Sequence, residues 1–198
     1  NTGIADDIVT QTKREYREYF VNEFLLPAIF DRGGRDLESA GIGWIEPCDT
    51  TFNIDGLSSD ESKEVCLAVI RIMGAMRRYP GGALSGGNAP VNVKKYLEAV
   101  ATSRGFEKEH FVQSVASVVT ATFAPEWTLR LSAEEAVLQI KTHSENAESW
   151  ECENCSRRHL NRALGVCTYA GCNHFGLVVS PLVKEDDYYA WLASLEAR

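Results

Sequence analysis

The chain has 198 residues, of which 44% are hydrophobic, and its 28 acidic and 20 basic residues give a formal net charge of −8. That length suits one ordinary domain, or one domain with a small module. The acidic balance disfavours a broad electrostatic coating of nucleic acid but permits a local basic patch. No apolar run approaches the roughly 18 residues that cross a bilayer, so we expect no membrane contact.

The start of the sequence predicts a fragment of a cytoplasmic protein. The chain begins with Asn1 rather than Met, as expected of a processed chain or a piece of a longer polypeptide. It opens without the basic stretch and following apolar stretch that make a secretion signal. We therefore expect a cytoplasmic location.

The first predicted element is a long amphipathic helix from Ile4 to Phe30. Its apolar residues recur at helical spacing and form one face. That face consists of Ile8, Tyr16, Phe20 and Phe24. Pro27 is expected to end or kink the helix near its close. The Gly- and Pro-rich segment 31–53 then predicts a loop, with a short strand near Trp44.

Three further helices are predicted by apolar periodicity and by start and stop signals. The first begins at a capping box formed by Ser58 and Glu61 and stops before the flexible stretch from Tyr79 to Pro90. The second covers Val91–Arg104, where Gly105 ends it, and the third covers Glu107–Thr122. The residues expected to face inward are Val65, Val69, Ile72, Met73, Met76, Val93, Tyr96, Leu97, Val100, Phe111, Val115, Val118, Val119 and Thr122.

The segment after these helices admits two interpretations. The stretch from Glu126 to Ser132 alternates and predicts a strand. In the next stretch Ser132 and Glu135 resemble another capping box, whereas "VLQIKT" alternates like a strand. Three helices and a hairpin would match the order of a winged helix; the alternative is an irregular helical domain with a small hairpin. We therefore predict a mostly helical α+β chain, with a helical domain over residues 1–142.

Six cysteines are too few, and their spacing is wrong, for a disulfide framework. Cys66 lies in the apolar run "VCLAVIRIM" and is expected to be a buried thiol, and Cys48 carries no signal. The other four form two short pairs: Cys152 and Cys155 as CxxC, and Cys167 and Cys172 as CxxxxC.

Two short cysteine pairs joined by a loop suit a tetrahedral zinc site, because each pair can donate two thiolates from a tight knuckle. A disulfide needs no such doublets, and a thioredoxin-like motif would need a single CxxC at a strand-to-helix turn. We therefore predict that Cys152, Cys155, Cys167 and Cys172 bind a structural Zn²⁺ in a zinc-ribbon module over residues 143–198. Within this module "GLVVSP" predicts a strand, and a helix that begins near Asp186 closes the chain.

His159 and His174 lie close to these cysteines, and either could replace one of them as a ligand. Our interpretation is that neither does. We expect His159 to be exposed beside Arg157 and Arg158, and His174 to pack near the site or donate a hydrogen bond to a ligand.

No catalytic motif accompanies this metal site. The chain has no P-loop, no dinucleotide-binding glycine pattern, no nucleophile elbow and no zinc-protease motif. The glycines of "GGALSGG" have no lysine in a phosphate-cradling position. We therefore expect this chain by itself to be no enzyme and to hydrolyse no ATP.

The last quarter of the chain resembles a segment of large bacterial superfamily 2 DEAD/DEAH-type helicases, which occur in phage-defence and DNA-repair systems. The resemblance lies in Trp150, Cys152, Cys155, His159, Leu160, Val166, Cys167, Thr168, Cys172 and Asp187 to Ala193. The second cysteine pair departs from the CxxC that is more usual there. The resemblance implies a larger helicase polypeptide around this segment, with the ATPase motifs outside the present chain.

Two functions of different class follow as hypotheses. In the first, the chain is a zinc-stabilised accessory part of a DNA-translocating helicase that positions nucleic acid or bridges the motor lobes, and Arg157, Arg158 and Arg162 contact the nucleic acid. In the second, it is a protein–protein adaptor that docks a defence or repair partner, and the arginines are incidental. A free-standing enzyme is a weaker third hypothesis, because the motifs that it would need are missing.

Overall fold

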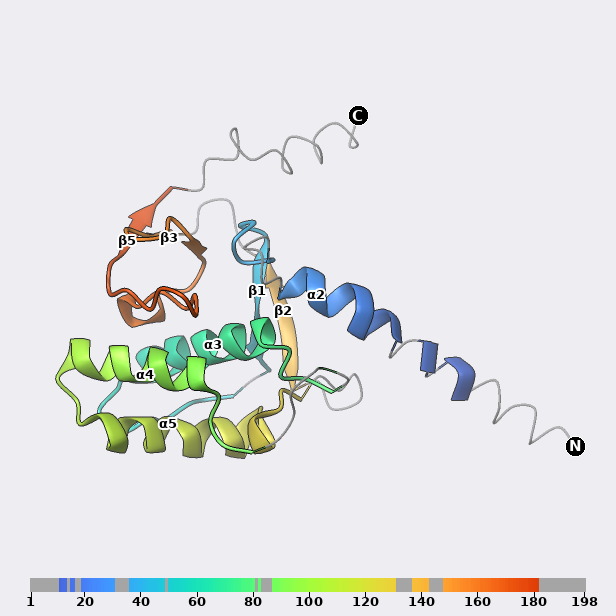
Figure 1. The fold of residues 1–198 in the computed structure, drawn as a ribbon, viewed down its shortest axis with the longest axis horizontal. Helices are drawn as coiled ribbons and strands as arrows, with labels where there is room; N and C mark the ends of the chain where they lie inside the picture. The colour runs from blue at the N-terminus through green and yellow to red at the C-terminus, as the bar shows by residue number, and fades with distance from the viewer. Residues whose placement is uncertain are drawn as a thin grey trace, which may run out of the picture.

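Three helices form the centre of the protein: α3 (Ser59–Ala75), α4 (Val91–Arg104) and α5 (Lys108–Thr122). In this computed structural model, α4 and α5 lie side by side and α3 packs against α4 (Figure 1). The structure describes residues 11–13, 15–16, 19–30, 36–48, 50–80, 82, 87–130, 137–142 and 148–181.

The first of these helices begins at the predicted capping box. The backbone N–H of Glu61 donates to Ser58 Oγ at 3.2 Å, and the backbone N–H of Ser58 donates to Glu61 Oε2 at 3.0 Å. Along α3 the expected inward residues Val65, Val69, Ile72 and Met73 are buried, and so is the thiol of Cys66; Met76 is half-buried.

The other two helices confirm their predicted bounds and faces. Gly105 ends α4 in the left-handed conformation, at φ 71°. The side chain of Glu107 caps α5 by accepting from the backbone N–H groups of Glu109 and His110. The expected residues that are buried in these helices are Val93, Tyr96, Leu97, Val100, Phe111, Val115 and Val119, while Val118 and Thr122 are half-buried.

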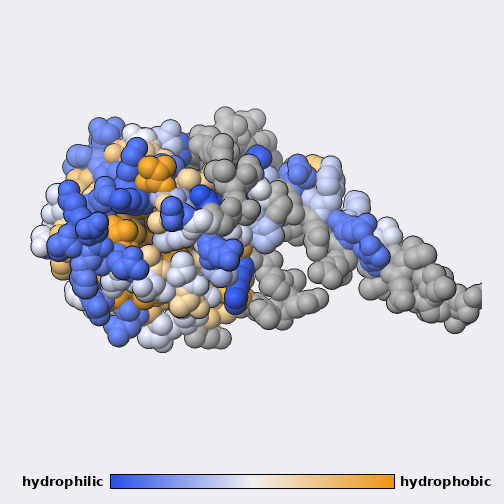
Figure 2. Space-filling view, turned by 60° about the horizontal axis from the view of Figure 1, so that its bottom comes forward, coloured by the Kyte–Doolittle hydropathy of each residue, from blue (hydrophilic) through white to orange (hydrophobic). Residues whose placement is uncertain are grey.

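The N-terminal segment is helical but does not bury its aromatic face. A π-helical turn, η1 (Val21–Leu25), leads into α2 (Leu26–Ile29). Pro27 cannot donate a backbone hydrogen bond, so the proline interrupts the regular α-helical pattern. Tyr16, Phe20 and Phe24 are exposed by 71%, 51% and 57%, and this segment projects from the rounded body (Figures 1 and 2). Ile8 lies outside the described residues.

A two-stranded antiparallel sheet joins distant parts of the chain. Strand β1 (Gly43–Pro47) pairs with β2 (Leu138–Thr142), and Ile45 lies opposite Ile140. This confirms the short strand near Trp44 and the strand interpretation of "VLQIKT". The alternative capping box, Ser132 with Glu135, lies outside the described residues.

The strand predicted from Glu126 to Ser132 is wrong over the residues that the structure describes. Pro125–Trp127 forms a 3₁₀ turn, η2, in which Glu126 and Trp127 have φ of 51° and 57°. Leu129 and Arg130 donate their backbone N–H groups to Arg78 and Phe123 rather than to a strand ladder. The partner of β2 therefore precedes the helices, and the helix–helix–helix–hairpin order of a winged helix does not occur among the described residues.

The C-terminal part is a small three-stranded antiparallel sheet. Strand β3 (Ser149–Cys152) lies between β4 (Arg158–His159) and β5 (Leu177–Ser180), so "GLVVSP" forms the predicted strand. The linker between the two cysteine pairs contains a short turn, η3 (Ala163–Gly165). The helix expected from Asp186 onwards lies outside the described residues.

The helices and the small sheet share one hydrophobic core. Ala163, Leu164 and Val166 of the linker belong to the same cluster of buried side chains as the inward faces of α3, α4 and α5. The predicted fold class, a mostly helical α+β chain with a four-cysteine module near its C-terminus, is confirmed. A domain boundary at residue 142 stays a prediction. Among the described helices, none is long and apolar enough to cross a bilayer.

Candidate metal centre

Two tight turns bring the four cysteines of the C-terminal sheet together. In the first, which follows β3, the N–H of Ser156 donates to the carbonyl of Cys152 at 2.8 Å. In the second, the N–H of Cys172 donates to the carbonyl of Tyr169 at 2.8 Å. Each turn places a left-handed residue directly after its second cysteine: Ser156 at φ 53° and Asn173 at φ 47°. The two turns are therefore built alike, although their cysteine spacings differ.

The four sulfur atoms have the arrangement of a tetrahedral metal site. The Sγ atoms of Cys152, Cys155, Cys167 and Cys172 all lie within 4.8 Å of one another. Across the two turns, Cys152 lies 3.7 Å from Cys172, and Cys155 lies 3.6 Å from Cys167. Zn–S bonds of about 2.3 Å in a tetrahedron separate the sulfur atoms by about 3.8 Å, whereas a disulfide bond is only about 2.05 Å long. The structure thus brings together the four predicted ligands at spacings that suit one shared cation.

Burial makes the thiols of Cys155 and Cys167 costly to ionise without a cation. The side chains of Cys152 and Cys167 are fully buried, and those of Cys155 and Cys172 are half-buried. Burial raises the pKa of Cys155 and of Cys167. At Cys172 burial acts in the same direction, but hydrogen bonds from the Asn154 side chain and the His174 backbone outweigh it and lower the pKa. A bound cation would compensate the charge of four adjacent thiolates.

His159 does not have the exposed position that the sequence suggested. Its side chain is only 1% exposed, because β4 turns it towards the metal centre and α3. Its Nε2 lies 3.5 Å from Sγ of Cys167, and its Nδ1 lies 2.9 Å from Nη1 of Arg71. An arginine can only donate, so Nδ1 accepts, Nε2 carries the proton, and Nε2–H points at the sulfur. Burial, with the charges of Arg71 and Arg157, holds the pKa of His159 well below its usual range.

His174 lies beside the four cysteines, as expected, and its backbone hydrogen-bonds to Cys172, while His159 adds a contact to Cys167 that the sequence had not suggested. His174 is exposed, and its backbone carbonyl accepts a hydrogen bond from the N–H of Cys167 at 2.9 Å. Nε2–H of His159 donates to the sulfur of Cys167, and such contacts around a metal site orient the side chains that bind the metal.

A buried charge cluster supports His159. Arg71 makes a two-point ion pair with Asp36, at 3.0 and 3.1 Å, and its Nη1 lies 3.1 Å from Glu38 Oε1. Burial would raise the pKa of Asp36, but the charge and hydrogen bonds of Arg71 outweigh it and lower that pKa. Burial raises the pKa of Glu38, and the charge of Arg71 opposes this only in part. The sequence analysis missed this cluster. Its one visible signal was an arginine in the apolar run of α3.

Backbone groups of the linker between the turns are anchored on the helical region. Oε1 of Glu38 accepts from the N–H groups of Leu160 and Asn161, at 2.9 and 3.3 Å. Oε2 of Glu64 accepts from the N–H of Leu164 at 3.0 Å, and the hydroxyl of Tyr96 donates to the carbonyl of Ala163 at 3.0 Å. The metal centre and the helices are thus joined by directional contacts as well as by the shared core.

The three arginines of the linker region have different environments. The guanidinium of Arg157 lies over the ring of Tyr169, 3.7 Å from its centroid. Arg158 is half-buried in β4, and its backbone carbonyl accepts from Nη2 of Arg71 at 3.2 Å. Arg162 is exposed. Of the three, Arg157 and Arg158 are therefore only partly accessible.

The fold and the site together define an α+β protein with a four-cysteine centre docked on a helical core. The chain matches no protein-family model, no curated protein and no solved structure.

Proposed function

We propose that Cys152, Cys155, Cys167 and Cys172 bind one structural zinc ion. Thiolates are soft ligands, and four of them at tetrahedral spacing suit Zn²⁺. Four sulfur ligands fill the coordination sphere and leave no position for water or substrate. The observation that supports this proposal is that the four Sγ atoms all lie within 4.8 Å of one another.

Zinc at this position would hold the linker on the helices. Each turn supplies two ligands, so the ion would fix the ends of the segment that contacts Glu38, Glu64 and Tyr96. Binding free energy at such a site is also folding free energy. The role that we propose for the metal is therefore architectural.

For the chain as a whole, we propose an accessory role in a DNA-translocating helicase, in which it positions nucleic acid or bridges the motor lobes. The resemblance of the zinc segment to superfamily 2 helicases supports this role, and so do Arg157, Arg158 and Arg162 around the linker. The ATPase would belong to the rest of such a polypeptide. This function would place the protein in phage defence or DNA repair.

A protein–protein adaptor is the second candidate. Aromatic side chains of the N-terminal segment are exposed and offer an apolar surface that a partner could cover. They are Tyr16, Tyr19, Phe20 and Phe24. The net charge of −8 also favours a protein partner over nucleic acid.

Metal analysis tests the zinc proposal. Purified protein should contain about one zinc per chain, and chelation should unfold the C-terminal sheet. Cys152→Ser should lower stability far more than Cys48→Ser, because Cys48 is not among the four clustered thiols. Protein that stays folded without metal and with all four thiols free would contradict the proposal.

Salt-dependent binding separates the two candidate functions. If the arginines contact phosphates, replacing Arg157, Arg158 and Arg162 together by Ala should weaken binding to DNA of any sequence. The log–log salt slope should fall by roughly 0.7 to 0.9 for each lost contact. Metal content must be equal in the parent and the variant. A parent that binds no DNA at low salt would favour the adaptor.

A further inference from the structure

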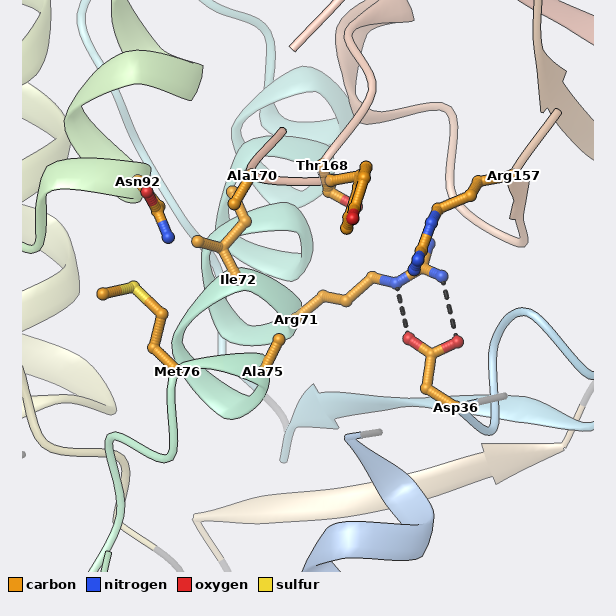
Figure 3. Close-up of a pocket in the computed structure, with 10 residues that line it drawn as sticks. Asp36, Arg71, Ile72, Ala75, Met76, Asn92, Arg157, Thr168 and Ala170 are labelled. Atoms are coloured by element: carbon orange, nitrogen blue, oxygen red, sulfur yellow. Dashed lines mark hydrogen bonds and ion pairs between the residues drawn. The ribbon is translucent and has the colours of Figure 1, made fainter. Parts of the chain in front are cut away.

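A cavity of about 390 Å³ opens between the helices and the second cysteine turn. We call it the knuckle cavity. Its lining residues come from α3, from the first turn of α4 and from both cysteine turns, together with Asp36 from the segment between α2 and β1 (Figure 3). Its apolar wall is made by Ile72, Ala75, Met76 and Ala170. The volume lies in the range of small-ligand sites, which is about 300 to 1,000 Å³.

Four polar side chains of this cavity have no hydrogen-bond or ion-pair partner among the described residues: Asn92, Arg157, Thr168 and Tyr169. Thr168 is the most informative of them, because its side chain is only 7% exposed. The hydroxyl of Thr168 is not fully enclosed by protein atoms, so it faces the open space of the cavity and is available to a ligand. By contrast Arg71, which also lines the cavity, is saturated by Asp36, Glu38, Ser39 and His159.

The positions of these groups indicate the ligand's shape. In Figure 3, Asn92 and Arg157 stand at opposite ends of the cavity, and Thr168 lies between them. One face of the Arg157 guanidinium rests on Tyr169, which leaves its edge for an anion. Arginine and threonine together can hold a phosphate, while the amide of Asn92 can both donate and accept at the edge of a base.

We propose that the knuckle cavity binds one unpaired nucleotide of a single-stranded nucleic acid, with its phosphate at Arg157 and Thr168 and its base against Ile72 and Met76. A carboxylate side chain of a partner protein would meet only one polar end, whereas a nucleotide meets both. A paired base could not enter, so the site selects single strands over duplex. This proposal rests on the nucleic-acid contact proposed above and specifies where it occurs.

The experiment measures binding of a short fluorescein-labelled oligothymidylate, and of a duplex of equal length, to the full zinc-loaded chain at low salt. The variants are Thr168→Val, which removes one hydroxyl, and Ala75→Leu, which fills the cavity without changing charge. Arg157→Ala and Arg162→Ala form a matched pair, because each removes one positive charge and only Arg157 lines the cavity. Metal content and thermal unfolding are checked in every variant.

Thr168→Val, Ala75→Leu and Arg157→Ala should each weaken single-strand binding by about fivefold or more, and Arg162→Ala by no more than about twofold. Duplex binding should be weaker and insensitive to Thr168→Val. If Arg157→Ala and Arg162→Ala weaken binding equally and Ala75→Leu has no effect, the cavity proposal is wrong, while a diffuse arginine contact survives. If the parent binds no single strand, both the cavity proposal and the proposed arginine contact with nucleic acid are wrong. Binding of polyglutamate that Thr168→Val and Ala75→Leu abolish would instead assign the cavity to an acidic protein partner.

Discussion

Nη1 of Arg71 lies 2.9 Å from Nδ1 of His159, and both side chains are buried. This contact connects helix α3 to the metal centre, because the other ring nitrogen of His159 faces the sulfur of Cys167. The guanidinium fixes the tautomer of the imidazole, and the imidazole in turn orients the thiol of Cys167. A change in α3 can therefore reach the metal centre through two side chains.

His159 should strengthen metal binding without being a ligand. His159→Leu removes the N–H that faces Cys167, and the zinc affinity should fall by about 10- to 100-fold. His159→Gln keeps a donor in the side chain and should recover part of the loss. Competition with a chromophoric chelator measures the affinity, and the thiolate-to-cobalt charge-transfer band of Co²⁺-loaded protein reports the ligand set. An unchanged affinity in His159→Leu would show that the contact has no effect on the metal.

Arg71 should be far more important for stability than an exposed arginine. Arg71→Met leaves Asp36 and Glu38 buried without their counter-ion, and the free energy of unfolding should fall by about 3–5 kcal/mol. Arg104→Met is the matched control, since Arg104 forms a 2.6 Å ion pair with Glu61 near the surface. That change should cost no more than about 1 kcal/mol. Urea unfolding with zinc present measures both, and equal losses would contradict the role given to the buried cluster.

Because Asp36 and Glu38 share Arg71 as their counter-ion, we expect the contribution of Glu38 to stability to depend on pH. Asp36 makes the two-point contact with Arg71, so Glu38 keeps a net cost of burial and its pKa is raised above the ordinary 4.5. A carboxyl with a raised pKa in the folded state contributes stability below pH 4.5 that is lost as the pH rises through the folded pKa. The stability advantage of the parent over Glu38→Gln should therefore shrink as the pH rises, by up to about 1.4 kcal/mol per pH unit. The free energy of unfolding of both zinc-bound proteins, measured at several pH values from about 4.5 upward, gives the difference. A constant difference would show that Glu38 does not titrate in the folded protein.

Local signals predicted much of this structure. Apolar spacing with a capping box at Ser58 and a glycine at 105 was enough for α3, α4 and α5, because those signals act within one or two helical turns. The doublet spacing likewise predicted which four cysteines come together. Such features depend on neighbours in sequence and can be read without the fold.

The features that the sequence analysis missed depend on distant partners. The alternation from Glu126 to Ser132 predicted a strand, but Pro125 starts a 3₁₀ turn and the partner of β2 is a segment that precedes α3. The contact of Arg71 with His159 joins side chains 88 positions apart, and only the tertiary fold brings them together. The same holds for the burial of His159, which local composition had indicated to be exposed.

Ser156 provides a direct test of the first cysteine turn. Its φ of 53° lies in the left-handed region, where a residue with a Cβ atom is strained by about 1–2 kcal/mol. Ser156→Gly should remove that strain, and the greater freedom of glycine in the unfolded chain should offset part of the gain, so stability should rise by up to about 1 kcal/mol. Ser117→Gly in the exposed part of α5 is the control and should lower stability by about 0.5–1 kcal/mol. Chemical denaturation of the zinc-loaded proteins measures both changes. Opposite signs for the two substitutions are expected, and a loss at Ser156 equal to that at Ser117 would contradict the left-handed turn after Cys155.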